Sequence, residues 1–449
     1  MITRWAGKDG SKTYNMFHST DMIENELSHA EKKGALDEST VDQTWLDAQQ
    51  DQAQQLNPEE KPPLSALINL DDFEQAFYKY GPAKPVAYVQ GASNDLLSLN
   101  ANKQYWQKIW FRPRVMRDVK EITTKMKMLG VDVNMPVWIA PMGIAKTAGP
   151  EGETALGAGA KASGIVHCMS TAASFGVEDI LASAPDHPFF FQLYVDRARH
   201  KTETLLHRLQ TMPQIKALFV TVDLAVVSKR EQDERIRSVE EAAASSYSGE
   251  GSTNKPDKRG GGLARTTGNF IDWQLSWDDI PWLRKHSNLP IVVKGIQSAA
   301  DAKIALAMGC AGIVISNHGG RALDSAPATI LILLELRRDC PEVFNKMDVL
   351  IDGGVRRGSD ILKAVCLGAK GVGVGRPFQC SVMYGTEGVE AAGEILQDEL
   401  ETAMRLCGVT NLEEVRGDLQ YLNCSEIEQF LPPKPTTGSL LFGALKARL

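Results

Sequence analysis

The most chemically informative stretch of the sequence is "ISNHGGRALD", residues 315–324. An apolar run ends there at Ser316, and His318, two glycines and Arg321 follow. An imidazole can take up a proton near neutral pH, and a guanidinium fork matches a carboxylate. A strand that only turns needs neither group. The pair therefore indicates a site where one side chain removes a proton while its neighbour holds an acidic substrate.

Short apolar runs bounded by Gly, Pro, Asp or Ser recur along the chain and would position these groups. Each is too short for a helix and apolar on both faces, as a buried parallel strand is. The runs are residues 136–140, 167–171, 189–195, 217–223, 291–295, 312–317, 348–354 and 371–376. Between them lie Ala/Leu-rich segments with helical spacing, such as residues 298–309 and 358–368. This alternation predicts an α/β fold, a (β/α)₈ TIM barrel, and an open doubly wound sheet is the alternative.

In such a barrel the functional groups lie at the C-terminal ends of the strands. The chemically distinctive residues at or near those ends are Pro141, Met142, Gly143, Ser170, Gln192, Tyr194, Thr221, Asp223, Arg230, Lys294, Ser316, His318, Arg321, Asp352, Gly353, Gly354, Arg356, Gly375 and Arg376.

Asp223 and His318 would face each other across the mouth of this barrel. A carboxylate bonded to an imidazole orients the ring and stabilises its charged form, which makes His318 a better base. A lone histidine is more often structural, so the prediction depends on Asp223, Lys294 and Arg321 sharing the same rim. Lys294 would need an anionic partner at a buried strand end, and a structural ion pair is the alternative for it.

The loops after the last two strands predict a phosphate site, because their glycines let backbone N–H groups approach an anion. Gly353, Gly354 and Gly375 supply the open backbone, and Arg376 adds a charge-assisted bond. The run "GVGVG" lacks the GxGxxG spacing of a dinucleotide fingerprint, and we reject that interpretation. Bare glycine turns remain the alternative for both loops.

Composition excludes several classes of protein. The 449 residues carry a net charge of −7 without a long Lys/Arg block, which argues against nucleic acid as a partner. No apolar run approaches the ~20 residues that cross a bilayer, so no membrane association is expected. Seven scattered cysteines without a CxxC pair predict reduced, mostly buried thiols and no metal site.

The ordered set "QLY", "TVD", "VKG", "SNHGGR", "DGGVRRG" and "GRPF" resembles the FMN-dependent L-2-hydroxy acid dehydrogenases and oxidases, flavocytochrome L-lactate dehydrogenases and glycolate oxidases among them. The resemblance implies FMN as cofactor, a small 2-hydroxy acid as substrate, and oxygen or a cytochrome- or quinone-type electron acceptor. It also implies a homotetramer.

The resemblance assigns roles to single residues. His318 would be the base, Asp223 its partner, and Tyr194 the residue that meets the substrate hydroxyl. Arg321 would hold the substrate carboxylate, with help from Tyr88 and Arg230. The FMN residues would be Pro141, Met142, Gly143, Ser170, Gln192, Thr221, Lys294, Ser316, Asp352, Gly353, Gly354, Arg356, Gly375 and Arg376. A non-catalytic flavin-binding carrier, or an FMN barrel with isomerase activity, is the alternative function.

The N-terminal region suggests three parts: residues 1–35, a linker at 36–63 and the barrel at 64–449. Residues 5–19 resemble the closing segment of a b-type haem domain, and His18 falls at the position of one axial ligand. The second ligand normally lies upstream in an HPGG motif that this chain does not contain. We therefore expect residues 1–35 to be a remnant that binds no haem.

Three further features bear on specificity and location. Gly143, Ala172 and Val227 occupy pocket positions that are often bulkier in lactate-specific relatives, which favours lactate-like or larger substrates. Residues 238–268, rich in Ser, Gly and charge, predict an excursion over the barrel mouth or an insertion without a role. The C-terminal Ala-Arg-Leu fits a tolerant SKL-type address and predicts a peroxisomal location, with cytoplasmic or mitochondrial location as alternatives.

Overall fold

The computed structural model describes residues 59–236, 262–268 and 270–434. The chain divides into two compact units, Met1–Pro62 and Pro63–Leu449. The described helices and strands belong to the second unit. His18, the expected haem-domain remnant and the C-terminal tripeptide lie outside the described residues. The same holds for most of the predicted linker and of the insertion at 238–268, so these assignments stay predictions.

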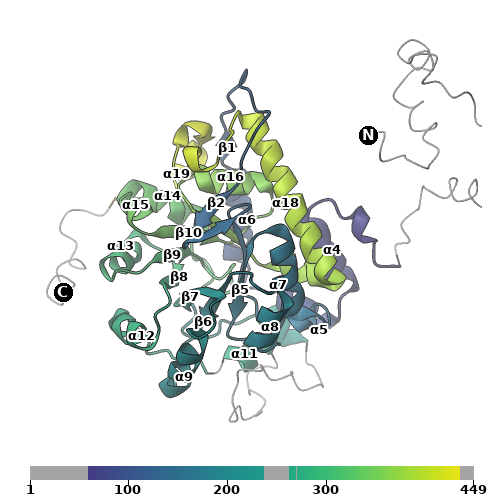
Figure 1. Cartoon of the computed structure of the whole chain (residues 1–449), viewed down its shortest axis with the longest axis vertical. Coiled ribbons are helices and arrows are strands. Elements are labelled where there is room, and N and C mark those ends of the chain that lie inside the picture. The colour runs from purple at the N-terminus through teal and green to yellow at the C-terminus, as the bar shows by residue number, and fades with distance from the viewer. Residues whose placement is uncertain (1–58, 237–261, 269, 435–449) are drawn as a thin grey trace, which may run out of the picture. The chain divides into compact units, whose positions relative to one another are not determined.

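Eight parallel strands close into a barrel, which confirms the predicted TIM barrel over the open sheet (Figure 1). They are β4 (Val137–Ile139), β5 (Val166–Ser170), β6 (Phe189–Leu193), β7 (Ile215–Thr221), β8 (Ile291–Ile296), β9 (Gly312–Ile315), β10 (Asp348–Asp352) and β11 (Gly371–Val374). The barrel closes where β11 pairs with β4, with Gly373 opposite Trp138. All eight apolar runs of the sequence therefore form barrel strands.

Aromatic side chains fill the barrel below the strand ends. The Phe219 ring stacks on Phe190 at a centroid distance of 5.0 Å and meets Trp138 edge-on at 6.2 Å. All three side chains are completely buried. A Cβ on Gly373 would lie 2.5 Å from the Trp138 ring, so only glycine leaves room for the indole beside it. This packed interior gives the strand ends a rigid base.

Helices surround the barrel, as Figure 1 shows. The main ones are α7 (Gly152–Ser163), α8 (Val177–Ser183), α9 (Arg199–Leu209), α12 (Ile280–His286), α13 (Ala299–Ala307), α14 (Thr329–Asp339), α16 (Gly358–Cys366) and α18 (Gly385–Cys407). Their starts follow local chemistry: the Ser298 side chain accepts a hydrogen bond from the Asp301 backbone N–H at 3.1 Å and caps α13. Helices α13 and α16 confirm the two segments singled out for helical spacing.

Shorter elements complete the unit. Helices before the barrel are α4 (Leu70–Tyr80), α5 (Ala83–Gln90) and α6 (Leu97–Gln107), and further short helices are α10 (Glu231–Arg235), α11 (Leu263–Gly268), α15 (Val343–Lys346), α17 (Arg376–Ser381) and α19 (Ser425–Glu428). Two small antiparallel pairs join β1 (Trp110–Phe111) to β12 (Leu422–Asn423) and β2 (Met126–Met128) to β3 (Val131–Val133). The 3₁₀ turns are η3 (Leu64–Ala66), η4 (Ala145–Thr147), η5 (Trp277–Asp279), η6 (Val382–Tyr384), η7 (Glu413–Val415) and η8 (Leu419–Tyr421).

Three findings bear on the composition-based expectations. All seven cysteines are free and buried, as predicted. Within the described ranges, no helix is both long and apolar enough to span a membrane. The described residues also include no cluster of three or more His, Cys, Asp or Glu side chains suited to a metal ion.

Candidate active site

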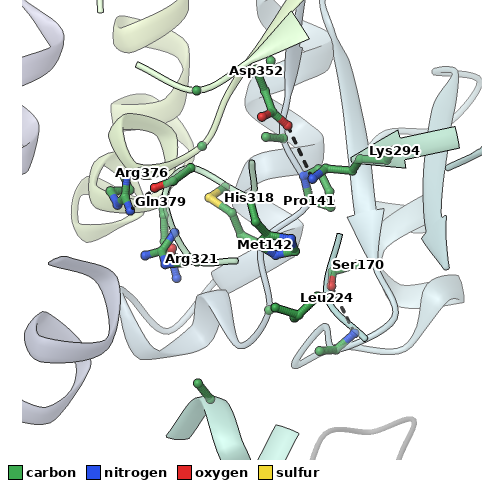
Figure 2. Close-up of a pocket in the computed structure, with 18 of the residues that line it drawn as sticks. Pro141, Met142, Ser170, Leu224, Lys294, His318, Arg321, Asp352, Arg376 and Gln379 are labelled. Carbon is green, nitrogen blue, oxygen red and sulfur yellow. Dashed lines mark hydrogen bonds and ion pairs between the residues drawn. The ribbon is translucent and has the colours of Figure 1, made fainter. Parts of the chain in front are cut away.

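A cavity of about 1040 Å³ opens at the C-terminal ends of the barrel strands. Figure 2 shows that side chains from opposite sides of the barrel converge on it. Most of the predicted site residues line it: Tyr88, Pro141, Met142, Gly143, Ser170, Tyr194, Arg230, Lys294, His318, Arg321, Asp352, Gly353, Gly354, Arg356, Gly375 and Arg376.

Four predicted residues, Gln192, Thr221, Ser316 and Asp223, do not line the cavity but support residues that do. The strand register sets Ser170 opposite Gln192, and the Ser170 hydroxyl donates to the Gln192 amide oxygen at 3.1 Å. The Gln192 amide nitrogen then donates to the Thr221 hydroxyl at 2.9 Å. Sequence reasoning identified these polar groups at the strand ends, and the structure joins them in one hydrogen-bonded row.

His318 and Asp223 form a dyad. The His318 Nδ1 lies 2.9 Å from Asp223 Oδ1, and the Asp223 side chain is fully buried. A carboxylate at Nδ1 favours the tautomer that carries its hydrogen there, so Nε2 keeps a free lone pair. The Tyr194 hydroxyl lies 3.3 Å from that Nε2. The arrangement can therefore accept a proton at Nε2 from a group bound in the cavity.

The electrostatics of the dyad suit a base that is neutral at rest. Burial lowers the pKa of His318, and the neighbouring Asp223 offsets part of that effect. Burial raises the pKa of Asp223, but its interaction with His318 and the positive charge of Lys294 outweigh this effect, and the pKa of Asp223 is lowered. Asp223 is therefore ionised and stabilises His318 when the ring takes up a proton.

The backbone brings the dyad together. At Gly295, which ends the "VKG" motif, φ is +116° and a Cβ would lie 2.6 Å from Asp223 Cβ. Only glycine allows this approach. His318 itself has a φ of +59°, an uncommon conformation outside glycine, and the Ser316 hydroxyl accepts a hydrogen bond from the His318 N–H at 3.0 Å. This turn points the imidazole into the cavity (Figure 2).

Lys294 has the acidic partner that the structural alternative required. Its Nζ lies 3.5 Å from Asp352 Oδ2 and donates to the Ser316 hydroxyl at 3.1 Å. Burial lowers the pKa of Lys294, but Asp352 and Asp223 raise it above the usual value. The ammonium thus stays charged at the cavity wall, where Figure 2 draws it paired with Asp352. Lys294 therefore forms a structural ion pair with Asp352 and also places a positive charge at the cavity.

Arg321 and Arg376 form a second cationic group at the cavity. Both guanidinium groups donate to the Val89 carbonyl, and Arg376 also donates to the Gly319 carbonyl at 2.8 Å. Within the part of the chain that the structure describes, neither ion-pairs with a carboxylate. Burial lowers the pKa of both groups, and for Arg321 the neighbouring Arg376 and Arg230 lower it further. A buried and a half-buried guanidinium group at one cavity call for anionic ligands.

Arg356, which the resemblance assigned to FMN, already has acidic partners within the protein. It ion-pairs with Glu74 at 2.7 Å and with Asp71 at 3.3 Å, so two carboxylates of α4 already neutralise it. Burial raises the pKa of Glu74, but the positive charges of Arg356 and Lys103 lower it, and the pKa of Glu74 is below its usual value. Arg356 still lines the cavity.

Sequence reasoning missed several lining residues, among them Leu224, Ala264, Gly268, Ile271 and Gln379. Gln379 lies one helical turn after Gly375, whose carbonyl accepts its backbone N–H at 3.1 Å, and that spacing was a usable signal. Its Nε2 is buried without a hydrogen-bond partner in the described structure. The four apolar residues carry no chemistry of their own, so no motif could have identified them.

The cavity fits an anionic cofactor such as the expected FMN. Beyond Gly375 an added Cβ would meet only Ala140, at 3.8 Å, so the backbone there faces open space. The amide Nε2 of Gln379, which has no hydrogen-bond partner among the described residues, and the buried Arg376 also line the cavity. Gly353 and Gly354 have φ values of +96° and +85° and expose their backbone to the cavity. These groups suit phosphate oxygens.

Comparison with known proteins agrees with this geometry. Residues 79–421 match the model of the family described as FMN-dependent dehydrogenase. L-lactate dehydrogenase (cytochrome) of Wickerhamomyces anomalus is 36% identical over 425 residues, which covers 93% of this chain and 73% of that protein. A peroxisomal (S)-2-hydroxyacid oxidase of Arabidopsis thaliana is 36% identical over 353 residues, covering 78% of this chain and 96% of the relative. Among solved structures, a flavocytochrome b2 variant with pyruvate bound superposes with a TM-score of 0.73 at 36% identity, covering 86% of this chain and 93% of its own.

Proposed function

This chain belongs to the FMN-dependent dehydrogenase family and oxidises L-2-hydroxy acids, and we propose that His318 is the base of that reaction. The observation that carries the proposal is the His318–Asp223 dyad, whose Nε2 faces the cavity beside Tyr194 and Arg321. The product is the corresponding 2-oxo acid.

Each protein group has a defined task in this proposal. Arg321 binds the substrate carboxylate through its fork, and Tyr88 and Arg230 complete that end, with the Arg230 guanidinium 6.0 Å from the centre of the Tyr88 ring. Tyr194 hydrogen-bonds the substrate hydroxyl. His318 Nε2 takes the hydroxyl proton, and Asp223 stabilises the imidazolium that results. FMN, when bound, accepts the C2 hydrogen together with its electron pair.

The cofactor is held by the remaining residues of the cavity. Arg376, Gly353, Gly354 and Gly375 would bind the phosphate and ribitol, with Arg356 and Gln379 beside them. Ser170 lines the cavity and would face the ring, and Gln192 and Thr221 support it in the same hydrogen-bonded row. Lys294, kept charged by Asp352, would place a positive charge near the ring. A cation ~4 Å from a developing negative charge contributes roughly 4 kcal/mol at an effective dielectric of 20.

Anaerobic mixing of the purified flavoprotein with a panel of L-2-hydroxy acids tests the function. At least one should bleach the flavin absorbance, and the D enantiomers should not. Bound flavin that no hydroxy acid reduces would contradict the oxidoreductase assignment and favour the carrier. Colourless protein that fails to take up added FMN would contradict the cofactor.

The electron acceptor is oxygen or a cytochrome- or quinone-type partner. Stopped-flow reoxidation separates these acceptors: air reoxidises an oxidase within turnover time, whereas a dehydrogenase needs the added acceptor. The same preparation tests the expectation about His18, because bound haem would show a Soret band. Light scattering of the holoprotein tests the homotetramer.

A peroxisomal location is supported by the C-terminal Ala-Arg-Leu and by the peroxisomal relative. An N-terminal fluorescent fusion should co-localise with a peroxisomal marker, and deletion of the three residues should disperse it. A mitochondrial or cytoplasmic pattern of the intact fusion would contradict this location.

A further inference from the structure

The cavity has a polar side and an apolar side. The polar side holds His318, Arg321, Tyr88, Tyr194 and Arg230, which account for the carboxylate and hydroxyl of the substrate. The apolar side consists of small or medium residues from three separate segments: Ala172, Leu224, Val227, Ala264, Gly268 and Ile271. A 2-hydroxy acid held at the polar groups has one remaining substituent, its side chain.

Helix α11 supplies part of the apolar side. Ala264 and Gly268 lie four residues apart and therefore on the same helix face, and both line the cavity. A Cβ on Gly268 would lie 2.3 Å from Val227 Cγ2, so the helix packs directly against the loop after β7. This part of the segment expected to be an excursion is thus a wall of the site.

Buried ion pairs and hydrogen bonds hold α11 in place. Asp233 on α10 is completely buried, accepts the backbone N–H of Ala264 at 3.1 Å and pairs with Lys84 at 2.8 Å. Arg265 pairs with Glu234 at 2.7 Å. Lys84 belongs to α5, the helix that also carries Tyr88. The apolar wall is therefore connected to the carboxylate-binding side through a single buried carboxylate.

Small side chains keep the opposite edge of this space open. A Cβ on Gly143 would lie 3.1 Å from the Ala172 Cβ and 3.6 Å from the Tyr88 hydroxyl. Any larger residue at this position would narrow the passage between Tyr88 and Ala172. Glycine at position 143 thus keeps this passage from closing.

We infer that α11 forms the binding wall for the substrate's side chain and that the preferred substrates are L-2-hydroxy acids with an apolar side chain longer than a methyl group. This rests on the proposed function and deepens it. Each methylene that the wall buries should raise kcat/KM roughly fourfold. Ala264 is the specificity-determining residue on α11, and Asp233 is a positioning residue.

The test is anaerobic flavin reduction by the holoprotein with a series from glycolate and L-lactate through L-2-hydroxybutyrate and L-2-hydroxyhexanoate to L-2-hydroxyoctanoate. We expect kcat/KM to rise from glycolate through lactate to the six- or eight-carbon acid. A steady decline from glycolate upward overturns the inference while leaving the function intact. Failure of every acid to reduce the flavin contradicts the function itself.

Variants of one residue separate specificity from stability. Ala264→Leu should lower kcat/KM for the octanoate at least tenfold and change the lactate value less than threefold, with FMN content unchanged. Ala264→Val, which perturbs α11 less, should give a smaller loss in the same order. Ala182→Leu, at an exposed alanine of α8, is the matched control and should change neither value. An equal loss for all substrates in both Ala264 variants would overturn the role of α11.

Discussion

His318 Nδ1 and Asp223 Oδ1 lie 2.9 Å apart although the two residues are separated by 95 positions in the chain. The contact depends on two backbone features: the left-handed turn at His318 and the missing side chain at Gly295. Asp223 lies just after β7 and His318 just after β9, and Gly295 lies in β8, the strand between these two. The dyad is therefore a consequence of the order of the strands in the barrel.

Replacing His318 with Ala should lower the rate of flavin reduction about 10²- to 10⁴-fold, the range that general-base catalysis usually supplies. FMN binding should be retained, because the groups assigned to the cofactor lie elsewhere in the cavity. Stopped-flow spectrophotometry under nitrogen measures the rate, and flavin absorbance per chain measures the content. His200→Ala on α9, outside the cavity, is the control. A near-normal rate in the variant would identify another residue as the base.

The pH dependence should follow the His318 dyad. Because burial lowers the pKa of His318, the neutral base persists at neutral pH, and kcat/KM should fall only as the pH drops below the ordinary value of about 6.5. Asp223→Asn removes the charge that raises this pKa, so the acidic limb should move to lower pH while the plateau rate drops. Asp132→Asn, at a surface aspartate, should leave both unchanged. A limb that moves to higher pH would show that Asp223 does not act on His318.

Arg321→Lys should mainly weaken substrate binding. An ammonium cannot offer the planar fork, and loss of a charge-assisted hydrogen bond corresponds to roughly 10- to 100-fold in KM. The flavin spectrum should stay the same. Steady-state kinetics with a dye acceptor give KM and kcat separately, with the exposed Arg208→Lys as control. A large loss in kcat at unchanged KM would place Arg321 in the chemical step instead.

Arg376→Met should weaken FMN binding, because the variant keeps the apolar stem but loses the buried charge. A charge-assisted hydrogen bond contributes about 1.5 to 3 kcal/mol, which corresponds to roughly a 10- to 100-fold higher Kd. Fluorescence quenching of FMN by the apoprotein measures this affinity. Wild-type affinity in the variant would assign the phosphate to other groups of the cavity.

Acid stability should reflect a buried histidine outside the site. Burial and the neighbouring His187 lower the pKa of His167 to about 3. The unfolded chain therefore takes up a proton near pH 6.5 that the folded chain refuses, so this contribution to stability is complete above that pH and is lost as pH falls toward 3. His167→Leu should flatten the decline in the free energy of unfolding between pH 6.5 and 4 by up to about 1.4 kcal/mol per pH unit. Thermal unfolding of holoprotein across this range measures it, and an unchanged slope would exclude His167 as the cause.

Much of the site could be predicted because its chemistry is local in sequence. The "SNHGGR" motif carries the proposed base and the proposed carboxylate-binding residue within four positions, and both line the cavity. The glycines at residues 353, 354 and 375 predicted a phosphate site, because glycine leaves the backbone N–H groups accessible to an anion. Pairing was harder to predict: Arg356 meets Glu74 and Lys294 meets Asp352 across the fold, and neither partner follows from the motif.

The apolar side of the pocket could not be predicted from residue types. Ala264, Gly268 and Ile271 have no functional groups. The first two lie at the end of the segment 238–268, whose composition suggested an excursion or an insertion without a role, and Ile271 follows it. Their contribution depends on a buried contact between Asp233 and the α11 backbone, 31 residues away in the chain. Such a contact leaves no periodic or compositional signal.

By itself the sequence determined the eight strands, the helices between them and the polar residues at the strand ends, because hydrophobic periodicity and side-chain chemistry are properties of short segments. Only the tertiary structure decided that the sheet closes, through the pairing of β11 with β4, and which strand-end groups thereby meet. Closure is a sum of contacts between residues far apart in the chain, and the pairing of β7, β8 and β9 likewise brings Asp223 and His318 together. The tertiary structure also decides that α11 packs at the pocket, where Ala264 and Gly268 line it.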